Sequence, residues 1–509
     1  MHIMECFVAF LVVLSAGFAL LDQSASAQGN NRKTAKPRLM YNMDYDALSG
    51  GFFGIATPDN IDKCTAYLAS SGITDLFICV NNQRVNYHSK VWDAMWDGFD
   101  PNAGADQPFL ADLSESESAG TQDQLRSFYN LYKQGCDYPQ RFLASARKDH
   151  IAGWISIRMN DCHFGDRPNN PYHSEFWRKH PEWYLRDGGC TGTELDYAQP
   201  EVREHYLALI REICEGYNLD GLELDFMRFP AYFHPGQWRQ GVDIMTDFVR
   251  EVRSITQKAS KRLKHPVKLA ARVHFLLWTS KHMGTDAVTW AKEKLIDLVV
   301  IAPWYTGIQS DMPIETWRGL LAGTKAELAF CLEDGINSSA EGRRLPTVEE
   351  TTGISLAALH RGADFIYLFN WYNLKQQADY TSLYKASRTY DTLLNLPRRH
   401  PVTTSDPFAA EGEQSLPFNL PAKAPRAVFS INIGPKPNPN QTACVEILTD
   451  TNTPPTRVLL NNTECKLTTT QSIRHIYESP KNTAAEGTNQ VTIESDGNIT
   501  INWVEIAIR

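Results

Sequence analysis

Residues 219–230 read LDGLELDFMRFP, and the architecture of the protein can be worked out from this stretch. Three acids and one arginine interrupt a run that is otherwise apolar enough to be buried. Side chains alternate between the two faces of a strand, so Glu223 and Asp225 would share one face. Leu222 and Leu224 would lie on the other face. Because burying an unpaired carboxylate is costly, we expect this pair of acids where cations stabilise it or where chemistry requires it.

Similar short apolar runs recur along the chain and alternate with helix-like segments. Eight runs are found: RLMYNMD (38–44), TDLFICVNN (74–82), IAGWISIRMN (151–160), LDGLELDFMR (219–228), VKLAARVHF (267–275), DLVVIAPWY (297–305), ELAFCLED (327–334) and DFIYLFNWYN (364–373). Segments between them, such as 60–72, 200–217 and 242–263, repeat apolar residues at intervals of three and four, as amphipathic helices do. Continuous apolar strands that alternate with helices predict a parallel sheet covered by helices, and eight such units predict a (β/α)8 barrel over residues 38–396. A doubly wound open sheet usually carries a Gly-rich phosphate turn, which this sequence lacks.

Two connections are long, 83–140 after the second strand and 161–199 after the third. Both are rich in polar and aromatic residues. Long loops in a compact domain are usually functional or disordered. In a barrel both would lie over the carboxyl ends of the strands, where active sites are built.

The composition changes near Pro397. Residues 397–425 contain repeated prolines and little apolar periodicity, which is typical of a linker. Beyond them, AVFSINIG, ACVEILTD, TRVLLNN, QVTIESD and NITINWVEIAIR are short alternating segments divided by Asn, Gly and Pro. They predict a small β-sandwich over residues 426–509. It could bind carbohydrate or pack on the barrel, and the sequence leaves both open.

The N-terminal 27 residues have an apolar run, Phe7 to Leu21, followed by Ala25-Ser26-Ala27. This pattern predicts a secretory signal peptide cleaved after Ala27, and hence a secreted or periplasmic protein with no membrane span after cleavage. Its lack of Lys or Arg before the apolar run leaves an uncleaved anchor as an alternative. Cleavage would move the net charge from −9 to −7, and so acidic a chain is a poor candidate for binding nucleic acid.

The nine cysteines beyond the predicted signal peptide are scattered and mostly lie in apolar contexts. This distribution does not indicate a disulfide framework. Cys444 and Cys465 are the pair we expect to bridge, if any does.

Polar and aromatic residues gather at the carboxyl ends of the eight predicted strands, which in a barrel open into one mouth. In strand order they are Asn42 and Asp44; Asn81 and Asn82; Arg158, Asn160, Asp161 and His163; Glu223, Asp225 and Arg228; Arg272 and His274; Trp304 and Tyr305; Glu333 and Asp334; and Asn370 and Tyr372. Sugar rings stack on aromatic rings, and their hydroxyls pair with carboxylates, amides and guanidinium groups. The mixture therefore predicts a carbohydrate site. We expect substrate contacts from Asp44, Arg158, Asn160, Asp161, His163, Arg228, Arg272, His274, Trp304, Tyr305 and Asn370.

Hydrolysis of a glycosidic bond needs two carboxyl groups, one to protonate the leaving oxygen and one to attack or to activate water. We expect Asp225 to be the group that attacks or activates water, and we expect it to be kept ionised by Arg228 and by Arg272 or Arg158. Glu333, in the apolar context AFCLED, is expected to be the proton donor, because burial raises a carboxyl pKa.

The remaining acids are less clearly assigned. Asp44, Asp161 and Asp334 are rivals to Glu333. Glu223 lies deeper along its strand, where it would assist by pairing with an arginine or by binding a sugar hydroxyl.

The run YNLDGLELDFMRFP, with the preceding ELDYAQPEVREHYLALIREICEGY, resembles the motif of the secreted glycosyl-hydrolase-like family 10 proteins. There a helix that starts with Gln-Pro-x-Val-Arg leads into a D-G-hydrophobic-acid-hydrophobic-D strand. WISIRMNDCH in the third predicted strand is similar to a segment of bacterial members of that group. The resemblance covers residues 38–400. It implies a (β/α)8 glycosidase without a cofactor and an essential acid at Asp225, with Glu223 beside it.

Two other functions remain open from the sequence. One is a barrel that binds glycans without cleaving them. The other is a metal-dependent hydrolase in which Asp161, His163 and His274 hold the ion, although no metal is expected in the preferred interpretation. The arginines near the acids hint at an anionic sugar such as a uronic acid or a sulfated glycan.

Overall fold

The computed structural model describes residues 38–51, 53–104, 106–304, 307–338, 342–371, 380–385, 389–403, 420–423, 425–497 and 499–509. The predicted signal peptide and most of the predicted linker lie outside these residues. Within the described part of the chain, every helix is too short or too polar to cross a lipid bilayer.

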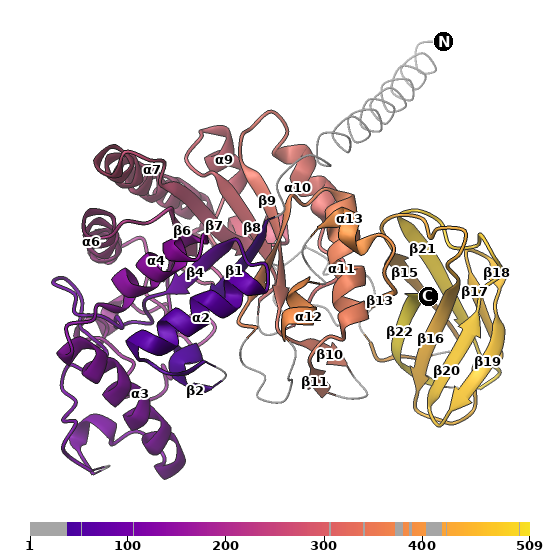
Figure 1. The fold of residues 1–509 in the computed structure, drawn as a ribbon, viewed down its shortest axis with the longest axis horizontal. Coiled ribbons are helices and arrows are strands. Elements are labelled where there is room, and N and C mark those ends of the chain that lie inside the picture. Colours follow the sequence, from indigo (N-terminus) through magenta and orange to yellow (C-terminus); the bar gives the residue numbers. More distant parts are fainter. Residues whose placement is uncertain are drawn as a thin grey trace.

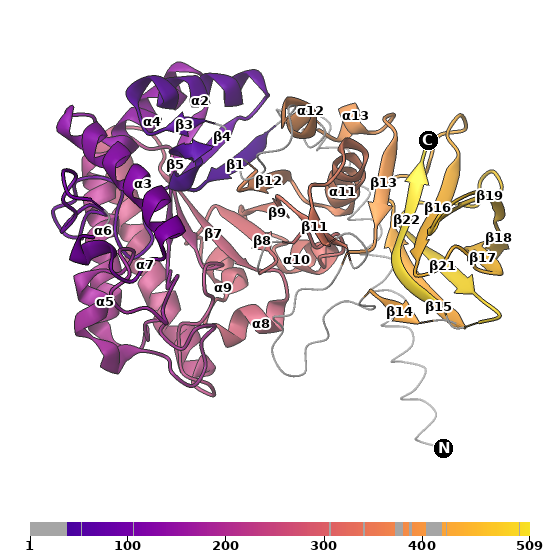
Figure 2. The same ribbon diagram turned by 90° about the horizontal axis from the view of Figure 1, so that it is seen from below.

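Eight parallel strands close into a barrel, as the sequence predicts (Figures 1 and 2). They are β1 (Leu39–Met43), β4 (Asp75–Cys79), β5 (Ala152–Arg158), β6 (Gly221–Asp225), β7 (Lys268–His274), β8 (Leu298–Ala302), β9 (Glu327–Glu333) and β12 (Phe365–Phe369). Each strand pairs with its neighbour in the sequence of barrel strands, and β1 pairs with β12 to close the ring. All eight predicted strands are therefore present.

Helices cover the outside of the barrel (Figure 1). They are α2 (Pro58–Ser70), α3 (Glu115–Lys133), α4 (Tyr138–Lys148), α5 (Glu175–Lys179), α6 (Pro200–Gly216), α7 (Trp238–Leu263), α8 (Leu277–His282), α9 (Ala287–Lys292), α10 (Ile314–Leu320), α11 (Val348–Arg361), α12 (Tyr380–Lys385) and α13 (Tyr390–Leu393). The start of α2 shows local sequence control. The side chain of Thr57 caps the helix by accepting from the backbone N–H of Asn60, and Pro58 occupies the first turn.

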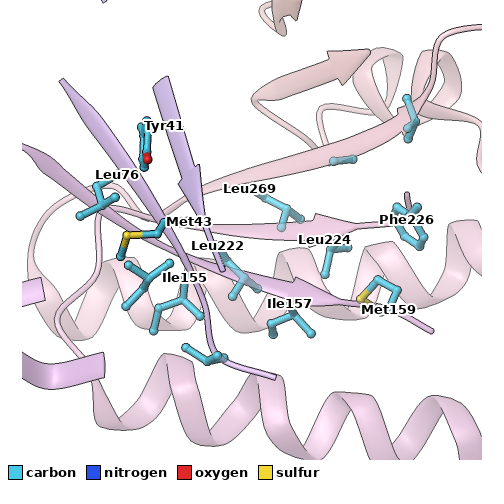
Figure 3. Close-up of a cluster of buried hydrophobic side chains, with 14 of the residues drawn as sticks. Tyr41, Met43, Leu76, Ile155, Ile157, Met159, Leu222, Leu224, Phe226 and Leu269 are labelled. Atoms are coloured by element: carbon cyan, nitrogen blue, oxygen red, sulfur yellow. The ribbon is translucent and has the colours of Figure 1, made fainter. Parts of the chain in front are cut away.

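Strand β6 separates its side chains as the alternation predicts. Leu222, Leu224 and Phe226 point outward and join an apolar cluster with Ile155 and Ile157 of β5 (Figure 3). Because these side chains fill the space between strands and helices, the acids of β6 are forced to the inner face.

The interior of the barrel near the amino ends of the strands is packed with apolar side chains, including Met40, Phe77 and Trp154. The rings of Phe77 and Trp154 stack with centroids 4.7 Å apart. Trp154 leaves no room for a side chain at Gly221, where an added Cβ would lie 2.1 Å from the indole ring. This apolar layer fills the barrel near the amino ends of the strands, so the polar groups near the carboxyl ends face the opposite end of the barrel.

Short elements that follow the strands gather at that other end. The β2 (Ser49–Gly51) and β3 (Gly54–Ile55) pair follows β1, and the β10 (Ile336–Ser338) and β11 (Gly342–Arg344) hairpin follows β9. Together with α3 they lie at the lower side of Figure 1. The two long connections are more ordered than their composition indicates, because the first contains α3 and the second contains α5.

Two antiparallel sheets lie beside the barrel and form the C-terminal β-sandwich (Figures 1 and 2). One contains β13 (Arg398–Pro401), β14 (Ala422–Lys423), β16 (Ala443–Thr449), β19 (Lys466–Gln471), β20 (Arg474–Glu478) and β22 (Thr500–Ile508). The other contains β15 (Arg426–Asn432), β17 (Arg457–Leu460), β18 (Thr463–Glu464) and β21 (Thr488–Glu494). Strands β13 and β14 fall inside the segment predicted to be a linker, because both pair with β22.

Helix α11 carries the contact between barrel and sandwich. An added Cβ at Gly353 of this helix would lie 2.1 Å from the carbonyl oxygen of Arg399 in β13. The glycine therefore allows the helix and the strand to approach closely.

Cys444 and Cys465 are free thiols, so the expected bridge between them is wrong. Cys444 lies in β16 of the first sheet, and Cys465 follows β18 of the second. Burial raises the pKa of both thiols.

Candidate active site

Two carboxylates from different strands meet on one buried guanidinium. Arg272 of β7 donates from Nη1 to Asp225 Oδ1 at 3.0 Å and from Nη2 to Glu333 Oε1 at 2.7 Å. The register pairs Asp225 directly with Arg272 across β6 and β7, whereas Glu333 lies two strands away on β9. Asp225 also accepts from the backbone N–H of Met227 at 2.9 Å. The bridge holds both carboxylates at the carboxyl end of the barrel.

The surroundings of Glu333 perturb its pKa. Glu333 is 4% exposed, and burial raises its pKa to about 7, against the opposing effect of Arg272. Arg272 itself packs on the ring of Phe369, with its central carbon 3.8 Å from the centroid. A carboxyl group with this pKa can hold a proton near neutral pH and release it in a reaction.

Glu223 lies one layer below and has no arginine partner. It accepts hydrogen bonds from Asn42 Nδ2 at 3.1 Å, Ser156 Oγ at 2.7 Å and the Tyr367 hydroxyl at 2.8 Å. Burial and the nearby charge of Asp225 raise its pKa to about 7. Within the described chain no arginine or lysine forms an ion pair with Glu223, so its expected pairing with Arg272 or Arg158 is wrong.

A second charged group surrounds Arg158 at the end of β5. Its guanidinium forms ion pairs with Asp44 and Asp161, the latter at 2.8 Å. Asp44 also accepts from Asn370 Nδ2 at 2.9 Å. Burial alone would raise the pKa of Asp44, but Arg158 and Arg228 outweigh it and lower the pKa below the usual value. Asp44 and Asp161 are thus held as anions and are poor candidates for a proton donor.

Arg228 and His163 form the outer edge of this group. His163 Nδ1 lies 2.6 Å from Asp161 Oδ1, and its Nε2 lies 3.2 Å from Arg228 Nη2. Arg228 was expected to lie beside Asp225. Arg272, which was also expected there, contacts Asp225 because its strand is in register with it, whereas Arg228 follows the end of β6.

The other predicted site residues have structural contacts. Asn160 donates to the carbonyl oxygens of Leu195 and Ala231, at 3.0 Å and 2.6 Å. Its amide therefore holds two connections together. Asn81 likewise donates to the carbonyl oxygen of Arg158, and Asn82 to the Tyr45 hydroxyl.

Three further predicted residues at the strand ends are described, and two are not. The buried His274 accepts from the backbone N–H of Leu276 at 3.1 Å. Trp304 packs against the interior cluster, and Asp334 forms an ion pair with Arg343. Tyr305 and Tyr372 lie outside the described residues.

The ligand set proposed for a metal ion is not assembled. Asp161 and His163 contact each other, but His274 belongs to a different contact network. No group of three His, Cys, Asp or Glu side chains in the described ranges is arranged to hold a metal ion.

Sequence reasoning missed Ser156, Tyr367 and Phe369. Ser156 could have been found from strand alternation, because it lies two residues before Arg158. Tyr367 and Phe369 could not, because the run FIYLF is apolar on both faces and gives no sign of which one turns inward.

No family model matches the chain, and no curated protein matches it either. Similar solved structures include the galactosidase domain of the alpha-galactosidase-sucrose kinase AgaSK, with 11% identity and a TM-score of 0.38, covering 91% of this chain and 55% of that one. This chain thus spans about half the length of that structure. A putative alpha-L-fucosidase from Bacteroides thetaiotaomicron has 11% identity and a TM-score of 0.36, covering 92% of this chain and 93% of that one.

The glycoside hydrolase domain of PgaB (BpsB) from Bordetella bronchiseptica has 10% identity and a TM-score of 0.39, covering 66% of this chain and 94% of that one. All three similar structures are named as glycosidases. TM-scores this low say nothing about the reaction of this chain, and the resemblance to glycosyl-hydrolase-like family 10 stays a prediction.

Proposed function

We propose that the barrel hydrolyses glycosidic bonds of an oligosaccharide or polysaccharide, with Glu333 as the proton donor and Asp225 as the nucleophile or base. The observation that carries this proposal is the Asp225–Arg272–Glu333 bridge at the open end of the barrel. It brings two carboxyl groups together on one guanidinium, and hydrolysis of an acetal requires two carboxyl groups.

The different surroundings of the two acids support their different roles. The ion pair with Arg272 favours the ionised form of Asp225, which suits attack on carbon or activation of water. Glu333 has a pKa of about 7 and therefore carries its proton up to near neutral pH, which suits a proton donor.

Glu223 has a similar pKa but a different position. It is completely buried and lies about 7 Å further along β6 from the open end, by the rise of a strand. Its carboxylate already accepts hydrogen bonds from Asn42, Ser156 and Tyr367. We assign it the role of positioning residue for Asp225, through the electrostatics of the barrel interior.

The test is a screen of the protein without residues 1–27 against a panel of polysaccharides, read by release of reducing ends. Asp225→Asn and Glu333→Gln should each lower kcat by about 10²- to 10⁴-fold on the substrate found. Glu251→Gln, at an exposed position on α7, is the control for handling and expression. Turnover that survives both active-site substitutions contradicts the proposal.

Aryl glycosides distinguish the two roles. A dinitrophenyl leaving group departs without protonation, so Glu333→Gln should cleave such a substrate far better than the natural one, whereas Asp225→Asn should remain slow on both. A glycan that binds to the unaltered protein and is never cleaved would instead indicate a non-catalytic carbohydrate-binding barrel. Activity that disappears on dialysis against a chelator and returns with metal would favour the metal-dependent alternative.

A further inference from the structure

Arg228 differs from the other arginines at the mouth of the barrel. Arg158 and Arg272 each contact two carboxylates, and Arg343 contacts Asp334. Arg228 is half-buried, and among the described residues no carboxylate lies within ion-pair distance of it. Its hydrogen bond is to the His163 ring, and its Nε atom is buried without a hydrogen-bond partner. Arg228 thus forms no direct ion pair with a described carboxylate, although Asp44, Asp161 and Glu333 are close enough for its charge to lower their pKa.

His163 is oriented to work with this guanidinium. Its Nδ1 faces the Asp161 carboxylate, which places the proton on that nitrogen and leaves Nε2 facing Arg228. The His163 side chain is 35% exposed, so the pair meets solvent. Because Nε2 then accepts from Arg228, His163 fixes the position of the guanidinium, and the remaining N–H groups of Arg228 are the donors for an anion.

The backbone around this pair is strained. Phe164 follows His163 with φ 61°, and Phe229 follows Arg228 with φ 52°, both in the left-handed region. Bulky residues rarely adopt it because of steric overlap between the side chain and the backbone. The Phe229 ring meets the His163 ring edge-on at 4.7 Å. Two strained turns thus hold the two side chains together, and such strain is concentrated at functional sites.

The pair also adjoins the proposed catalytic carboxylates. The central carbons of Arg272 and Arg228 lie 3.8 Å and 5.9 Å from the centroid of the same Phe369 ring. Arg228 is close enough to Glu333 for its charge to lower the pKa of that carboxyl group, against the larger effect of burial. A group bound by Arg228 would therefore belong to a sugar next to the bond that is cleaved.

We propose that Arg228, with His163, is an anion-binding subsite that selects glycans bearing a carboxylate or a sulfate ester near the scissile bond. Guanidinium pairs with the two oxygens of such groups in a planar, bidentate arrangement. The inference rests on the proposed function, and it narrows the source of the charge. Of the arginines expected near the acids, Arg158 and Arg272 are each paired with two of the protein's own carboxylates, which leaves Arg228.

The experiment compares matched substrates. A uronate polysaccharide is paired with its carboxyl-reduced form, and a sulfated polysaccharide with its desulfated form. Arg228→Gln is expected to raise KM by about 10- to 100-fold on the anionic member of one pair, because it removes a charged hydrogen bond. It should leave KM on the neutral member nearly unchanged. Arg228→Lys should recover part of the loss, and the pair affected identifies carboxylate or sulfate.

Arg239→Gln on α7 is the control, because it removes the same charge at an exposed position. An equal effect of Arg228→Gln on both members of each pair, or a preference of the unaltered enzyme for the neutral members, overturns the inference while leaving the proposed function intact.

A binding measurement separates the two proposals if no glycan is cleaved. Calorimetry with the anionic and neutral oligosaccharides on the unaltered protein then tests the subsite alone. Binding of the anionic member that Arg228→Gln abolishes and Arg239→Gln preserves supports the subsite without hydrolysis. Equal binding of both members, no binding of either, or binding that Arg228→Gln leaves unchanged overturns it.

Discussion

Substitution of Glu333 by Gln should stabilise the protein at high pH and not at low pH. The Glu333 pKa is 4.5 in an unfolded chain and about 7 in the native structure. The native state therefore holds this proton more tightly than the unfolded state does. The stability that the group contributes is fully present below about pH 4.5 and is lost as the pH rises through about 7.

The size of the effect follows from the two pKa values. The difference between 4.5 and about 7 corresponds to about 3 kcal/mol. Glutamine resembles the protonated carboxyl group, and its carbonyl oxygen can still accept from Arg272. We expect Glu333→Gln to unfold with the free energy of the unaltered protein at about pH 4.5, and to be more stable by up to about 3 kcal/mol at pH 8.

Urea unfolding of both proteins at several pH values, followed by tryptophan fluorescence, measures this difference. Glu251→Gln on α7 should show no such pH-dependent gain, because that side chain is exposed. The reasoning fails if Glu333→Gln has the same effect at both ends of the range, or if it is less stable than the unaltered protein at pH 8. A gain in stability together with lost turnover would show that burial of this acid serves activity at a cost to the fold.

Three further outcomes are expected. Arg272→Met should destabilise the protein by about 3–5 kcal/mol at pH 8, because it leaves two buried carboxylates without their cation. Adding Asp225→Asn and Glu333→Gln to this variant should restore much of the lost stability. Denaturation of Arg272→Met that matches the unaltered protein would contradict this. The kcat/KM for glycan cleavage should fall as the pH rises through about 7, because Glu333 then loses its proton. Arg228→Gln should move this fall to higher pH, since Arg228 lowers the pKa of Glu333. A fall that moves to lower pH refutes the assignment of Glu333 as the proton donor. Gly221→Ala should lower Tm and reduce the free energy of unfolding by about 1–3 kcal/mol or more, because the added methyl group overlaps Trp154. Gly216→Ala is the control and should not lower Tm, because no atom lies near its added methyl group. Equal Tm values for the two variants would show that the side chains around Trp154 rearrange to make room.

Local patterns were sufficient for the barrel and for the orientation of β6. Acids at every second position mark the inner face of LDGLELD, and the structure places Glu223 and Asp225 there and Leu222 and Leu224 against the helices. The same reasoning was less exact on β12, which was predicted to extend to residue 373, although Asn370 does lie at the mouth and donates to Asp44. The strand ends at Phe369, and Asn370 adopts a left-handed conformation with φ 58°. Strand β12 is apolar on both faces, so no polar residue in it marks the face that turns into the barrel.

The amino-acid sequence alone determined which residues collect at the mouth, because period-two alternation and the order of strands and helices are local properties of the chain. Only the tertiary structure decided which cation meets which acid. Arg272 reaches Glu333 from two strands away because the barrel closes, and closure depends on long-range pairing that no short stretch of sequence contains. The same closure left Arg228 to His163, so the structure selects Arg228 from the three arginines that the sequence pattern offered.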